Sequence, residues 1–119
     1  MSFKVDERYN AVVYKITSSK FMGGPDWSSF HDKMHTLLEE GKKNAIVDLS
    51  RVKFMNSSGI GVLIRAMTTM RAGGGDLRLT GVTNRIQSLL VMTKLINVFK
   101  TFDTVDAAVA SYEESPAGA

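Results

Sequence analysis

Residues 47–63 read VDLSRVKFMNSSGIGVL, and this stretch decides the fold. It begins within the apolar run AIVDL at residues 45–49. This run has the length and composition of a strand that is buried on both faces of a parallel sheet. The polar turn NSSG follows at residues 56–59, and apolar side chains then recur at helical spacing up to three glycines at 73–75. The helical stripe consists of Ile60, Leu63, Ile64, Met67 and Met70.

Upstream of this stretch, the pattern predicts a hairpin and a first helix. Residues 3–8 and 11–17 are rich in β-branched and aromatic side chains, and Tyr9-Asn10 between them is a turn signal. A loop over 18–25 ends in Gly23-Gly24-Pro25, and Asp26 is expected to cap a helix that ends at Gly41. The apolar face of this helix consists of Trp27, Phe30, Met34, Leu37 and Leu38.

Downstream, two further strand and helix pairs are predicted. Residues 76–80 alternate as a strand, and Thr83 is expected to cap a helix that continues to about Met92. Residues 98–102 form a last strand, Thr104 caps a last helix, and residues 113–119 form a flexible tail. Strands that alternate with helices after a hairpin indicate an α/β fold with a small, mostly parallel sheet.

Composition limits the size and class of the protein. The chain has 119 residues, 44% hydrophobic and 23% charged, which fits one domain over 1–119 with its core at 3–112. No apolar run approaches the roughly 20 residues of a membrane span, and the N-terminus is charged where a signal peptide is apolar. We therefore expect a cytoplasmic protein without membrane insertion.

Charge and cysteine content exclude further classes. The absence of cysteine excludes disulfides, zinc–thiolate sites, iron–sulfur clusters and thiol nucleophiles. The net charge is +3, but the basic residues are spread along the chain, with no cluster longer than Lys42-Lys43. A nucleic-acid-binding protein usually carries a basic stripe with aromatic side chains, so nucleic acid is not an expected partner.

The serine turn has a structural and a regulatory interpretation. Ser57 or Ser58 is predicted to be the N-cap of the helix, because a hydroxyl there accepts a backbone N–H that has no helical partner. A hydroxyl at a helix N-terminus can also carry a phosphate, because the helix dipole and the free N–H groups favour negative charge. Phosphorylation would then add about −1.5 to −2 charges to the surface and leave the fold intact.

Nucleophilic catalysis is the rival use of these serines. The surroundings of Ser57 do not match the Gly-x-Ser-x-Gly elbow, because Met55 stands where that motif has glycine. A catalytic triad needs a histidine, and the sequence contains only His31 and His35, which both fall on the first predicted helix. We therefore expect no catalytic residues and no enzymatic activity.

Three other features could bind ligands. His31 and His35 lie one helical turn apart and could share a metal, but no third ligand is evident, so a solvated pair without metal is expected. The glycines at 73–75 follow a helix, the reverse of a phosphate loop, and are read as a helix stop. Gly23-Gly24 is a connector or a contact surface. No cofactor is expected.

The segment 48–63 resembles the signature of the STAS domain, as found in bacterial anti-sigma factor antagonists. Residues 74–79 and 83–95 are similar to the next strand and helix of that family, and the resemblance extends over residues 3–112. It implies a STAS-like fold: a small, mostly parallel sheet with an N-terminal hairpin and about four helices packed on one face.

The resemblance also implies partner switching. The unphosphorylated antagonist binds an anti-sigma factor that is also a serine kinase of the histidine-kinase-like ATPase type, and the released sigma factor directs transcription. The kinase phosphorylates the first serine of the turn, which maps to Ser57, with Ser58 as second choice, and the antagonist dissociates. A PP2C-type phosphatase reverses the modification.

The implied partner-binding residues include two departures from the family pattern. The family often has Asp before the first serine, where this chain has Asn56 and lacks that negative charge. The second strand of the family commonly ends in a Gly-x-Leu-Asp stretch, where this chain reads FMGGPD at 21–26. Only Asp26 is expected to keep the capping role there. The expected contact residues are Asn56, Ser57, Ser58, Gly59, Gly23, Gly24 and Asp26.

Three alternatives stay open. The chain could be a STAS module of another assembly, such as a stressosome or the cytosolic subunit of a lipid-transport complex, in which the serine is not phosphorylated. It could use the turn to bind a nucleotide or lipid. It could also be a weak hydrolase.

Overall fold

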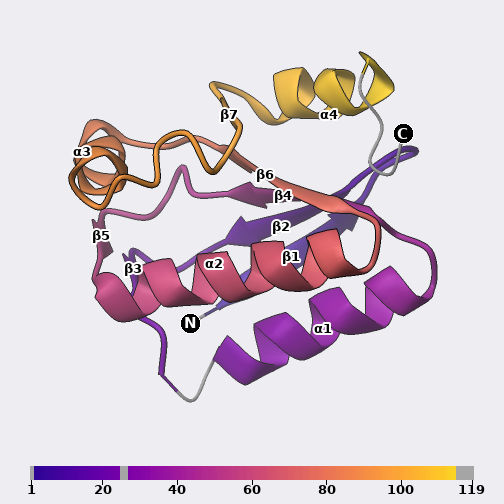
Figure 1. The fold of residues 1–119 in the computed structure, drawn as a ribbon, viewed down its shortest axis with the longest axis horizontal. Helices are drawn as coiled ribbons and strands as arrows, with labels where there is room; N and C mark the ends of the chain where they lie inside the picture. The colour runs from indigo at the N-terminus through magenta and orange to yellow at the C-terminus, as the bar shows by residue number, and fades with distance from the viewer. Residues whose placement is uncertain (1, 25–26, 115–119) are drawn as a thin grey trace.

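A five-stranded sheet in the order β1-β2-β4-β6-β7 forms the centre of the molecule (Figure 1). The computed structural model describes residues 2–24 and 27–114. The β1–β2 hairpin is antiparallel, and β2, β4, β6 and β7 are mutually parallel, as predicted. The strands are β1 (Phe3–Glu7), β2 (Val12–Ile16), β4 (Asn44–Asp48), β6 (Asp76–Thr80) and β7 (Thr101–Phe102).

The helices cover both faces of this sheet. Helices α1 (Trp27–Glu39) and α2 (Ser57–Ala72) pack on the face that carries Tyr14, in the larger hydrophobic core. Helix α4 (Val105–Glu114) packs on the opposite face, against Val13 and Ile46 (Figure 1). The expectation of helices on one face only is therefore wrong. Strands β2 and β4 are apolar on both faces, and an uncovered second face would expose Val13 and Ile46 to water.

A second, two-stranded sheet was not predicted. Strand β3 (Lys20–Phe21) pairs in parallel with β5 (Phe54–Met55), within segments that the sequence pattern leaves as connections. The backbone N–H of Lys53 also donates to the carbonyl oxygen of Ser19 at 2.8 Å. This small sheet lies at the carboxyl end of the parallel strands and leads directly into α2 (Figure 1).

The remaining helix boundaries largely follow prediction. Helix α3 (Asn84–Met92) begins after Thr83, whose hydroxyl accepts from Ile86 N–H, and Thr104 accepts from Ala107 N–H at the start of α4. Strand β7 is shorter than predicted, and α4 includes residues 113 and 114, which were assigned to the flexible tail. Residues 115–119 and the predicted cap Asp26 lie outside the described residues. Among the described helices, none is long and apolar enough to span a bilayer.

Candidate functional site

Asn56 forms the start of helix α2. Its backbone is extended, with φ −109° and ψ −178°, and its side-chain oxygen accepts a hydrogen bond from Gly59 N–H at 2.9 Å. The prediction that Ser57 or Ser58 is the N-cap is therefore wrong. Asn and Ser are comparable caps, and the residue that caps is the one that the preceding strand β5 leaves in extended conformation.

Both serines are exposed within the first turn of α2. Within the described residues, neither serine hydroxyl makes a hydrogen bond, and the first turn contains no acidic residue. The free N–H groups and the positive end of the helix dipole therefore act on Ser57 and Ser58 without a neighbouring carboxylate in the same turn.

Strand β3 and the residues after it pack tightly on the start of α2. A Cβ on Gly59 would overlap the carbonyl oxygen of Phe21, and a Cβ on Gly23 would lie 3.0 Å from the carbonyl oxygen of Ser58. Gly23 and Gly24 have φ values of +72° and +95°, a conformation that favours glycine. The structure thus brings together every described member of the predicted contact set: Asn56, Ser57, Ser58, Gly59, Gly23 and Gly24.

A groove of about 380 Å³ lies beside the serines, between the first turns of α1 and α2. Ser57, Gly61 and Arg65 are four residues apart, so they lie on one stripe of α2. A Cβ on Gly61 would meet no atom within 4 Å, which leaves the groove open between Ser57 and Arg65. The guanidinium of Arg65 lies 5.3 Å from the centre of the Trp27 ring, which forms the opposite wall.

Sequence reasoning missed part of this groove. Trp27 packs against the hydrophobic core, as its place on the apolar face of the helix predicts, but it is only partly buried and also lines the groove, whereas Phe30 is fully buried. Neither Gly61 nor Arg65 is among the predicted contact residues. The four-residue spacing from Ser57 is the signal that could have found them, but their pairing with Trp27 depends on how α1 packs against α2.

The histidines are held away from the serines. His31 Nε2 lies 3.0 Å from the hydroxyl oxygen of Thr69, and His35 Nδ1 lies 3.1 Å from a carboxylate oxygen of Glu39. Thr69 is twelve residues along α2 from Ser57, or about 18 Å at 1.5 Å per residue. His31 is therefore not positioned as a base for Ser57. Among the described residues, no group of three or more acidic or histidine side chains could hold a metal ion.

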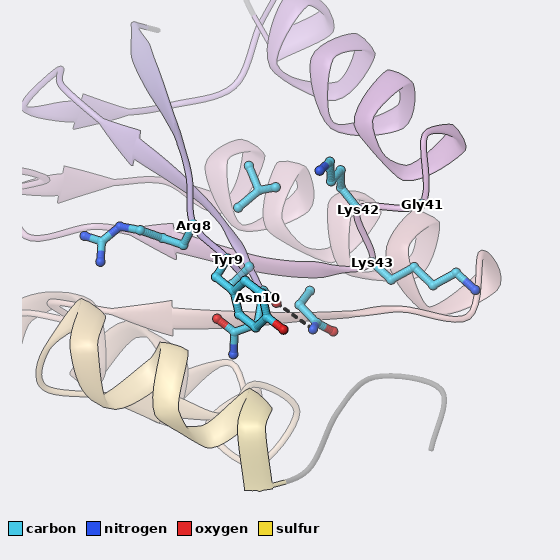
Figure 2. A pocket seen from close by; sticks show the side chains of 9 residues that line it. Arg8, Tyr9, Asn10, Gly41, Lys42 and Lys43 are labelled. Atoms are coloured by element: carbon cyan, nitrogen blue, oxygen red, sulfur yellow. Dashed lines mark hydrogen bonds between the residues drawn. The ribbon is translucent and has the colours of Figure 1, made fainter.

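Another hollow, of about 330 Å³, lies at the opposite end of the sheet, between the β1–β2 turn and the α1–β4 connection (Figure 2). The side-chain amide of Asn44 donates to the carbonyl oxygen of Asn10 at 2.7 Å and ties the two segments together (Figure 2). Arg8 is paired with Asp6 at 2.8 Å, and Lys42 lies 3.7 Å from Glu7. These carboxylates balance two of the cations in the hollow.

The STAS domain model matches residues 2–108 of the chain. The chain belongs to the STAS domain family. A candidate anti-sigma factor antagonist of Thermotoga neapolitana is 26% identical to this STAS domain over 72 residues. That alignment covers 60% of this chain and 64% of the Thermotoga protein, so it spans less than two thirds of the relative.

Solved STAS structures share the fold. The crystal structure of a candidate anti-sigma factor antagonist from Thermotoga maritima superposes with a TM-score of 0.79 at 20% identity, over 93% of this chain and 94% of that chain. The anti-sigma factor antagonist SpoIIAA in its unphosphorylated form gives 0.78 at 18% identity, over 95% and 97%. The phosphorylated form of SpoIIAA from Bacillus gives 0.70 at 19% identity, over 92% and 98%.

Proposed function

We propose that this STAS domain is a cytoplasmic anti-sigma factor antagonist that is switched by phosphorylation of Ser57. In the unphosphorylated form it binds an anti-sigma factor that is also a serine kinase of the histidine-kinase-like ATPase type, and the sigma factor is released for transcription. Phosphorylation by that kinase ends the binding, and a PP2C-type phosphatase restores it. The protein itself acts by binding, not by catalysis.

The observation that carries this proposal is the cap formed by Asn56. Because the Asn56 side chain satisfies Gly59 N–H, the hydroxyl of Ser57 is not needed to begin α2. Ser57 is exposed, and the first turn of α2 has no carboxylate to repel a phosphate. A phosphate there would gain about 0.3–1 kcal/mol from the helix dipole.

The position of Ser57 explains how the modification would act on a partner. Ser57 lines the groove that Trp27 and Arg65 border, and Gly24 closes it on the side of the β3–α1 connection. A partner that covers this groove removes Ser57 from water. A phosphate of about −1.5 to −2 charges would then have to be desolvated on binding, which opposes association by several kcal/mol per buried ion.

Binding measurements with the purified kinases test the proposal. Each histidine-kinase-like anti-sigma factor encoded in the same genome is titrated, without ATP, with the wild-type chain and with the Ser57→Asp and Ser57→Ala variants. We expect one kinase to bind the wild type and Ser57→Ala with similar affinity, and Ser57→Asp to bind at least about tenfold more weakly. Thermal unfolding should be similar for all three proteins.

The matched control is Thr36→Asp, which places the same charge at an exposed position of α1, nine residues after Trp27. It should bind like the wild type. If Ser57→Asp also binds like the wild type, Ser57 is not a switch and the chain is a STAS module of another kind. If Ser57→Asp instead unfolds at a much lower temperature, the role of Ser57 is structural.

A further inference from the structure

Most of the exposed large apolar side chains lie at one end of the molecule. Five such side chains are exposed within the described residues, and all but Tyr9 belong to β5, to α3, or to the residue after β3. Phe54 is 42% exposed, Val91 55% and Met92 79%. Tyr9 lies in the β1–β2 turn at the opposite end (Figure 2).

Phe54, Val91 and Met92 line two adjoining hollows along α3. A groove of about 430 Å³ between β5 and α3 is lined by Phe54, Leu89 and Met92, with Arg85 and other residues around them. A second hollow, of about 500 Å³, includes Val91 and shares Met92 with the first. Phe54, Leu89, Val91 and Met92 thus form one apolar surface, which we call the α3 patch.

Residues 2–24 and 27–114, which the structure describes, do not cover this patch. Helix α3 directs Ile86 and Leu90 into the core, where both are fully buried. Val91 and Met92 lie outside that buried stripe, and no described residue of the chain buries them. A concave apolar surface next to a proposed binding site is typical of a place where partner side chains insert.

Positively charged side chains lie on the elements that form the patch or next to them in the chain. Arg85 lines the groove itself, Lys20 stands opposite Phe54 in the β3–β5 pairing, and Arg51 and Lys53 lie in the β4–β5 connection. All four are exposed, and in the part of the chain that the structure describes none of them forms an ion pair. The described ion pairs belong to Arg8, His35, Lys42, Arg71 and Arg78.

We infer that the α3 patch is a docking surface for an acidic protein segment, one that inserts apolar side chains between β5 and α3 and carries carboxylates toward Lys20, Lys53 and Arg85. This inference names the chemistry of the partner in the proposed function and rests on it. Carboxylates that meet unpaired cations at an apolar interface favour association and the correct orientation of the partner.

The location of the patch also explains why phosphorylation of Ser57 would weaken partner binding and not strengthen it. Phe54 precedes Ser57 by three residues, and the two are joined by Met55 and the cap Asn56. A phosphate on Ser57 would bring negative charge to a surface that attracts an acidic partner by its positive charge. Repulsion between the phosphate and the partner's carboxylates would then add to the desolvation penalty.

The test uses the kinase that binds the wild-type chain in the titrations above. Met92→Asp removes apolar contact and adds a negative charge, and Arg85→Glu reverses a charge of the rim. Each should weaken binding about tenfold or more, and the wild-type dissociation constant should rise as NaCl is increased. Both substitutions are at exposed positions, so unfolding temperatures should stay close to wild type.

Two control variants match these changes elsewhere on the surface. Tyr9→Asp introduces an acid at an exposed aromatic side chain, and Lys33→Glu reverses an exposed charge on α1. Both should bind within about twofold of wild type, as is usual for residues outside an interface. A comparable loss of binding in the controls would attribute the effect to overall charge and overturn the inference.

The remaining outcomes separate this inference from the proposed function. If Met92→Asp and Arg85→Glu bind like the wild type while Ser57→Asp does not, the α3 patch is not the docking surface, and the Ser57 switch stands. If they weaken binding while Ser57→Asp does not, the patch stands without the switch. If no kinase binds, both fail. If the wild type, but not Met92→Asp, sediments with phosphatidylglycerol vesicles, the patch binds a lipid surface and the inference fails.

Discussion

The side-chain oxygen of Asn56 accepts the N–H of Gly59 at 2.9 Å, and this hydrogen bond begins helix α2 one residue before the first serine. An asparagine supplies this acceptor without the charge of the aspartate that the family often has at this position. The positive end of the helix is therefore not neutralised by residue 56, and it remains available to a negative group on Ser57.

The cap predicts which substitution destabilises the helix. Asn56→Ala removes the acceptor for Gly59 N–H and should lower the free energy of unfolding by about 1 kcal/mol. Ser57→Ala removes no hydrogen bond within the described residues, so it should change stability by less than about 0.5 kcal/mol. Urea denaturation compares the two variants. If Ser57→Ala lowered the free energy of unfolding more than Asn56→Ala does, the Ser57 hydroxyl would be the cap of the helix in solution.

Gly59 and Gly61 form a matched pair on the same helix. Gly59→Ala should be strongly destabilising or prevent folding, because its Cβ would overlap the Phe21 carbonyl oxygen and push β3 away from α2. Gly61→Ala places a methyl group in open space and should raise stability by about 0.5–1 kcal/mol, because alanine favours the helix. Thermal unfolding of both variants provides the comparison. Equal effects of the two substitutions would contradict the packing of β3 on α2.

Two buried tyrosines should respond differently to loss of the hydroxyl. Tyr112 on α4 donates to the carbonyl oxygen of Ala45 at 2.7 Å, and Tyr112→Phe should destabilise by about 0.5–1.5 kcal/mol. The hydroxyl of Tyr14 is buried and has no hydrogen-bond partner within the described residues, so Tyr14→Phe should be neutral or stabilising. Urea denaturation measures both changes, and the reverse order would refute this assignment.

The same tyrosines predict a loss of stability in alkali. Burial raises the pKa of both Tyr14 and Tyr112 above the ordinary value of 10.0. The folded state therefore keeps its protons at a pH where the unfolded state has lost them. Stability is unaffected by these groups below about pH 10 and falls above it, by at most about 1.4 kcal/mol per pH unit for each tyrosine.

Urea denaturation between pH 8 and pH 11 measures this loss. The double variant Tyr14→Phe/Tyr112→Phe should lose stability less steeply above pH 10 than the wild type, because the phenol groups no longer titrate. An unchanged slope in the double variant would assign the alkaline loss to other groups.

The sequence patterns that predicted the fold correctly are long ones. The apolar stripes of α1 and α2 extend over several turns, and the strand at residues 44–48 has the apolar centre Ala45-Ile46-Val47, so periodicity and composition identify them. Strands β3 and β5 have two residues each, too few for any period. They are defined by pairing between segments more than thirty residues apart, which local patterns do not show.

The candidate site was predicted in its position but not in its details. The turn NSSG contains three residues that can cap a helix, and sequence preference does not rank them. The choice of Asn56 depends on the β3–β5 pairing, which fixes the chain just before it. The groove wall of Trp27 and Arg65 likewise requires the packing of α1 on α2, so neither residue could be assigned to the site from sequence alone.

The most direct test of the switch is the position of the phosphate. The chain is incubated with ATP and the histidine-kinase-like anti-sigma factor that binds it, and the modified residue is located by peptide mass spectrometry in the wild type and in Ser57→Ala and Ser58→Ala. We predict one phosphate on Ser57 in the wild type, the same modification in Ser58→Ala, and none in Ser57→Ala. Full phosphorylation of Ser57→Ala, or a phosphate at any other residue of the wild type, would contradict the account.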